Sequence, residues 1–71
     1  MTPLERRAAF KAVVTLQQLT MAEAAASLGV SYNHLTLVLW GKRIGSNRLK
    51  GEIARFLGMA TSTVFTESDV A

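Results

Sequence analysis

Apolar residues recur at helical spacing along most of the chain, and Ser/Thr residues or glycines separate the segments. Between Met21 and Trp40 the sequence MAEAAASLGVSYNHLTLVLW holds two such segments, which meet at Gly29. The first segment has a narrow apolar stripe at spacings of three and four, formed by Ala24, Ala25 and Leu28. The second has a stripe formed by Leu35, Val38 and Leu39. This pattern predicts a helix-turn-helix, in which the first helix braces a second that is presented outward.

A longer helix is predicted before this pair, from the start of the chain to about Gln18. Thr2 and Glu5 have the spacing of a capping box, and Pro3 suits the first helical position. The face predicted to pack on the core carries Leu4, Phe10, Val13, Val14 and Gln17. The residues predicted to point away from the core are Arg6, Arg7 and Lys11.

The two helices of the predicted helix-turn-helix have their own start and stop signals. TMAE, from Thr20 to Glu23, repeats the capping-box pattern, and Gly29 suits a left-handed helix end. Ser31 caps the next helix, which runs to about Trp40 and is closed by Gly41. A strand over residues 35–40 is the alternative, because LTLVLW is rich in strand-forming residues. The cap and the closing glycine favour the helix.

Two further helices complete the prediction. One runs from its cap Ser46 to Leu57 and ends at Gly58, with a core face of Leu49, Ile53, Phe56 and Leu57. Gly51 inside it costs about 1 kcal/mol relative to alanine. A short last helix is capped by Thr61 or Ser62 and buries Val64 and Phe65, and fraying is expected beyond Glu67. We therefore expect an all-α fold, a single compact bundle of four to five short helices over residues 1–71.

Composition narrows the functional classes. The 71 residues include no cysteine, one histidine and five acids, so we expect no disulfide and no structural metal site. No apolar run approaches the roughly 18 residues that cross a bilayer, and no signal peptide is recognisable, so a soluble cytoplasmic protein is expected. No paired carboxylates or Ser/His/Asp set occurs at a supporting spacing, so an enzyme is not expected, nor a cofactor or a small-molecule effector.

Positive charge gathers after the second helix of the pair. The formal net charge is +3, which alone says little about a partner. Between Lys42 and Lys50 the sequence KRIGSNRLK carries four basic residues and no acid. This stretch is either an ordinary solvated loop or a segment that holds a polyanion such as DNA beside the predicted helix-turn-helix.

Three segments together resemble a known family. TMAEAAASLGVS, then LWGKR, then EIARFLG resemble the DNA-binding domains of the lambdoid phage repressors and Cro proteins, over roughly Phe10 to Phe65. The resemblance implies a lambda-repressor-like bundle of about five helices with a Gly-Lys pair just past the recognition helix. Val14 and Leu39 stand where family members often carry a paired Arg and Glu. The loop after Gly41 is one residue longer, and the glutamines that often read bases are absent, so the operator sequence does not transfer.

Reading DNA requires an exposed helix face with groups that match base edges in the major groove. If the apolar stripe of the recognition helix faces the core, the side chains predicted to read bases are Tyr32, Asn33, Thr36 and Leu37. The Asn33 amide can pair with N6 and N7 of adenine, and Thr36 and Leu37 can touch thymine methyl groups. Helix N-termini and cations favour phosphate. The predicted phosphate contacts are Thr20, Met21, Ser31, His34, Lys42, Arg43 and Arg48, while Trp40 is expected to be half-buried packing.

A domain this small reads few base pairs, so a homodimer on a palindromic double-stranded operator is expected. Met59, Val64 and Phe65 are the predicted dimer interface, with core packing as the alternative for Phe65. The implied function is a transcriptional regulator, and the short chain favours a Cro-like or small controller protein over a two-domain repressor; an excised DNA-binding domain is the alternative. A rival from another class is an antitoxin-like protein-interaction module, whose DNA affinity would be nearly indifferent to Asn33 and Lys42.

Overall fold

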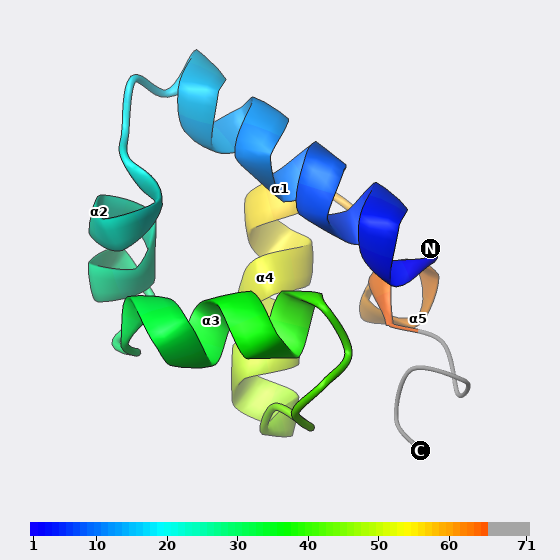
Figure 1. The fold of residues 1–71 in the computed structure, drawn as a ribbon. Coiled ribbons are helices and arrows are strands. Elements are labelled where there is room, and N and C mark those ends of the chain that lie inside the picture. Colours follow the sequence, from blue (N-terminus) through cyan, green and yellow to red (C-terminus); the bar gives the residue numbers. More distant parts are fainter. Residues whose placement is uncertain (66–71) are drawn as a thin grey trace.

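A computed structural model describes residues 1–65, which fold into a bundle of short helices (Figure 1). The helices are α1 (Pro3–Leu16), α2 (Met21–Ser27), α3 (Tyr32–Leu39), α4 (Asn47–Leu57) and α5 (Thr61–Val64). No strand occurs within these 65 residues, so the all-α prediction is confirmed and the alternative strand over residues 35–40 is wrong. Across the same residues, no helix has both the length and the apolar character to cross a membrane. The predicted fraying beyond Glu67 lies outside the described residues.

The predicted caps start the first four helices. Thr2 and Thr20 each accept the N–H of the glutamate three residues later, and each glutamate accepts the cap residue's own N–H, so both capping boxes are present. The Ser31 and Ser46 hydroxyl oxygens likewise accept the N–H groups of His34 and Leu49 at 3.1 Å. Each bond satisfies a backbone donor that the helix itself leaves open.

The start of α5 differs from the prediction. Its N-cap is Ala60, which forms no side-chain capping bond, so Thr61 and Ser62 lie inside the helix rather than at its cap. Burial of Val64 and Phe65 holds this single turn in place, because both side chains enter the core. Tertiary packing therefore overrides the local capping preference.

The first four helices all end in the same way. The residue after the last turn is in the left-handed conformation, and the next N–H reaches a carbonyl five residues earlier. The left-handed residues are Gln18, Gly29, Gly41 and Gly58. The α1 helix stops at Leu16, two residues before the predicted end. At Gly29, where φ is +75°, this conformation makes the turn between α2 and α3.

Side chains from every helix meet in one core. The Phe10 and Phe56 rings of α1 and α4 stack with their centroids 4.8 Å apart. Leu35 and Leu39 of α3 are buried between these helices and α2, whose small Ala24 side chain lets α3 approach closely. The full buried set is Phe10, Val14, Ala24, Ala25, Leu35, Val38, Leu39, Leu49, Ile53, Ala54, Val64 and Phe65. The predicted stripes of α2, α3 and α4 are confirmed.

The predicted faces of α1 are wrong at its start. Arg6 is completely buried, whereas Leu4 is 66% exposed. Helical geometry explains both results, because Arg6 precedes Phe10 by four residues and shares its face, while Leu4 lies about 240° around the helix from Phe10. Gln17 is also exposed, because it lies just past the last residue of α1.

Buried Arg6 joins the ends of two helices to α1. Its Nε donates to the carbonyl of Leu39 at 2.9 Å, and its Nη1 donates to the carbonyl of Val64 at 3.1 Å. Leu39 and Val64 are the last residues of α3 and α5, where carbonyls lack helical partners and the helix dipole is negative. The guanidinium also lies 4.6 Å from the Phe65 ring centroid. A cation at this point therefore fixes the C-terminal end of α3.

Candidate nucleic-acid interface

The buried stripe of α3 determines which side of this helix faces outward. Leu35, Val38 and Leu39 are buried, so the opposite side is centred on Asn33 and Leu37. Asn33 is exposed, Leu37 is half-buried, and Tyr32 at the start of the helix is 53% exposed. The eight residues of α3 span about 12 Å, a length that fits across a major groove of about 12 Å.

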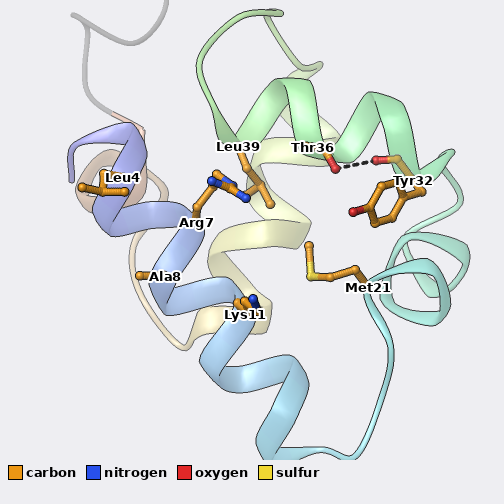
Figure 2. A pocket seen from close by; sticks show the side chains of 8 residues that line it. All are labelled: Leu4, Arg7, Ala8, Lys11, Met21, Tyr32, Thr36 and Leu39. Atoms are coloured by element: carbon orange, nitrogen blue, oxygen red, sulfur yellow. Dashed lines mark hydrogen bonds between the residues drawn. The ribbon is translucent and has the colours of Figure 1, made fainter.

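The hydroxyl group of Thr36 is already engaged within α3. Its Oγ1 donates to the carbonyl of Tyr32 at 2.9 Å, one helical turn earlier (Figure 2). Thr36 is half-buried, and with its proton committed it offers a methyl group and an acceptor oxygen, but no donor. The predicted contact with a thymine methyl group is compatible with this arrangement.

His34 and Arg43 contact each other across the C-terminal half of α3. Arg43 Nη1 lies 3.1 Å from His34 Nδ1. A guanidinium can only donate, so this contact requires an imidazole that accepts at Nδ1 and carries its proton on Nε2. The structure therefore joins two residues that the sequence assigned separately to phosphate, and it holds the exposed Arg43 beside α3.

The loop after α3 is fixed at both ends. The left-handed conformation of Gly41 lets the Lys42 N–H reach the Leu37 carbonyl at 3.0 Å, so this cation starts immediately beside the end of α3. At the other end, Gly45 is buried, and a Cβ there would lie 3.0 Å from Val38 Cγ1. The loop thus closes on the core side of α3 and leaves the Lys42 and Arg43 side chains exposed.

Some of the groups at the N-terminus of α2 that were predicted to contact phosphate already form hydrogen bonds within the protein. Thr20 is exposed and Met21 is half-buried, but the capping box already uses the N–H groups of Thr20 and Glu23. The same box places the Glu23 carboxylate at this helix end, where it opposes the approach of a phosphate. Ser31 is exposed, and because its oxygen only accepts in the capping bond, its hydroxyl proton can still be donated to a phosphate.

Arg48 lies apart from the loop cations. It lines a hollow of about 200 Å³ with Gly29 and Val30 of the α2–α3 turn and with Glu52 of α4. The acid in the same hollow reduces the positive potential around Arg48. Arg48 is exposed, so it can still reach outward from the N-terminal side of α3.

A second hollow lies between α3 and α1. Its volume is about 260 Å³, and it is lined by Leu4, Arg7, Ala8, Lys11, Met21, Tyr32, Thr36 and Leu39 (Figure 2). Arg7 stacks on Trp40 with its guanidinium carbon 4.0 Å from the ring centroid, and Trp40 is half-buried as expected. The sequence prediction missed this α1–α3 groove, because it treated α1 only as a support for the core.

The predicted dimer interface is corrected by burial. Val64 is fully buried and Phe65 is 9% exposed, so both side chains fill the core of the single chain. Core packing, the alternative considered for Phe65, accounts for both. Met59 is 41% exposed and is the one member of the predicted set that presents a side chain at the surface.

Acidic and metal-binding chemistry is sparse around α3. The chain has no acid between Glu23 and Glu52, a span that contains all of α3 and the basic loop. Among residues 1–65, no group of three or more His, Cys, Asp or Glu side chains is arranged to hold a metal ion.

No protein-family model, curated protein or solved structure matches this chain significantly.

Proposed function

We propose that the protein is a sequence-specific double-stranded DNA-binding transcriptional regulator of the lambda-repressor-like type, acting in the cytoplasm by inserting α3 into the major groove. The observation that carries the proposal is the outward face of α3. It combines exposed Tyr32 and Asn33 with the cations Lys42 and Arg43 at its C-terminal end. Exposed hydrogen-bonding groups on a helix flanked by cations are what base reading and phosphate attraction require.

Different residues carry different parts of the proposed binding. Asn33 reads adenine through its amide, a contact that discriminates by about 1 to 3 kcal/mol. Leu37 and the Thr36 methyl group contact thymine, and Tyr32 contacts a base methyl group or a phosphate. Lys42 and Arg43 hold the backbone without reading sequence. The protein binds as a homodimer on a palindromic operator and is neither an enzyme nor a cofactor-dependent regulator.

Selection of bound sequences from random duplex DNA tests the proposal directly. We expect an enriched palindromic motif whose half-sites are about one helical turn apart. Asn33→Ala should lose preference at one base pair in each half-site. Asn47→Ala is the matched control, because Asn47 is also an exposed asparagine in the first turn of a helix but lies on α4. Its motif should equal that of the wild-type protein.

Two results would reject the proposal. The first is no enrichment of any motif by the wild-type protein. The second is binding to DNA with an affinity that neither Asn33→Ala nor Lys42→Ala changes, which is the behaviour of a helical protein-interaction module. A single protomer per bound site, measured by sedimentation on a palindromic duplex, would reject the dimer while leaving DNA recognition by α3 in place.

A further inference from the structure

We infer that the α1–α3 groove is a second DNA-backbone site, in which Arg7 and Lys11 contact phosphates on the flank of α3 that is next to α1. This inference rests on the proposed function and extends it to α1, a helix with no assigned role in binding. The occupant is a phosphate of the same duplex whose major groove receives α3.

The groove lies along one edge of the outward face of α3. Tyr32 and Thr36 are one helical turn apart, and both line the groove, so they mark the edge of the outward face that is next to α1. Figure 2 shows the Tyr32 hydroxyl directed into the groove, with Met21 beside it. A duplex that seats its bases on Asn33 and Leu37 therefore brings one backbone toward this edge.

The lining of the groove is positively charged. Arg7 and Lys11 are the two charged residues that line the groove, and both are cationic. Lys11 is exposed, so its ammonium group can swing toward a phosphate without disturbing the core. Tyr32 adds a hydroxyl donor from the α3 side of the groove. Two cations and one hydroxyl complement the negative charge of a phosphate group, and the hollow of about 260 Å³ has room for one.

Arg7 is held in place by Trp40. Its guanidinium lies against the Trp40 ring at 4.0 Å from guanidinium carbon to centroid, and Trp40 directly follows the last residue of α3. Stacking holds the planar group in place while its N–H edges stay available for oxygen acceptors. Arg7 is thereby fixed beside α3 before DNA arrives, which lowers the entropy lost on contact.

The test measures how DNA affinity depends on salt, for the operator obtained by selection and for an unrelated duplex. Each lost phosphate contact should lower the slope of log K against log salt by about 1. We expect this drop for Lys11→Gln and for Arg7→Gln, about 2 for the double variant, and equal weakening on both duplexes. Lys11→Arg should retain the wild-type slope.

Arg55→Gln is the matched control. Arg55 is an exposed arginine in the last turn of α4, and it does not line the groove. It removes the same charge from the chain, so its slope should stay at the wild-type value. Arg7→Gln loses a packing contact with Trp40, so this variant alone could lose affinity by misfolding. Lys11→Gln is expected to fold like the wild-type protein, because Lys11 is exposed, and it therefore tests the groove independently.

The outcomes separate the two proposals. If the wild-type protein binds with a clear salt slope and the Lys11 and Arg7 variants match Arg55→Gln, the α1–α3 groove does not contact phosphate and this inference is overturned while the proposed function stands. If the wild-type protein does not bind DNA, the proposed function fails and this inference with it. A drop confined to the groove variants supports both.

Discussion

Replacing Arg6 by methionine tests whether the buried cation holds α3 in place. Methionine keeps the apolar stem of the side chain and lacks the guanidinium group, so the substitution removes the hydrogen bonds to the carbonyls of Leu39 and Val64. These oxygens would remain inside the protein without the guanidinium donors. An orphaned buried acceptor costs about 1 to 3 kcal/mol.

The net effect is smaller than the sum of the lost contacts. Two orphaned carbonyls and the lost contact with Phe65 destabilise the folded state, but removing a buried cation also removes its desolvation cost. We therefore expect Arg6→Met to lower the free energy of unfolding by about 2 to 4 kcal/mol. In a domain of this size, that corresponds to a fall in Tm on the order of 10 to 30 °C.

Thermal and urea unfolding followed by circular dichroism measure the effect. Arg55→Met is the control, since Arg55 is an exposed arginine on α4, and it should leave Tm nearly unchanged. Arg6→Lys should recover only part of the loss, because a single ammonium cannot reproduce the planar fork of the guanidinium. If Arg6→Met unfolds at the wild-type temperature, the two bonds contribute no net stability and the reasoning is refuted.

Three other predictions follow from local geometry. Gly51→Ala should stabilise the protein by about 0.5 to 1 kcal/mol in urea unfolding, since an added Cβ meets nothing within 4 Å, whereas Gly29→Ala should destabilise it because φ is +75° there. The hydrogen bonds from the Thr2 backbone and hydroxyl groups lower the pKa of Glu5 below its usual 4.5, so the Glu5 carboxylate stabilises the fold above that pH and loses this effect as the pH falls through the lowered value. The difference in free energy of unfolding between the wild-type protein and Glu5→Gln should therefore vanish in acid. A difference that stays constant with pH would contradict this. His34→Ala should release Arg43 and weaken binding to all duplexes alike in a fluorescence titration, and a loss at one base pair would instead assign His34 to base reading.

Local signals in the sequence were sufficient to predict where α1 to α4 begin. Ser and Thr caps define the starts of α1 to α4, because each capping bond joins residues only three positions apart. Gly29, Gly41 and Gly58 define three of their ends for the same reason. The start of α5 escaped this reasoning, because burial of Val64 and Phe65 rather than a cap holds that turn.

Interactions between distant parts of the chain were not predictable in the same way. Arg6 was predicted to point away from the core, although its four-residue spacing puts it on the same helical face as Phe10. The carbonyls that accept its bonds lie 33 and 58 residues away in the sequence. The outward face of α3 follows from its apolar stripe alone. The arrangement on the two sides of this face could not be predicted from the stripe, because the α1–α3 groove and the His34–Arg43 contact depend on how α1 and the loop pack against α3.

The use of acids explains why the surface around α3 stays basic. All eight Lys and Arg residues lie within residues 1–65, with three of the five acids. Glu5 and Glu23 are held in capping boxes, where each carboxylate accepts a backbone N–H, and Glu52 shares a hollow with Arg48. Two of these three acids therefore cap helices, and the third lies near Arg48 rather than near Lys42 and Arg43. It follows that Thr20, Met21 and Arg48 are the weakest of the predicted phosphate contacts. Lys42 and Arg43 lie in a stretch of sequence without acids, and among residues 1–65 no carboxylate lines the groove that holds Arg7 and Lys11.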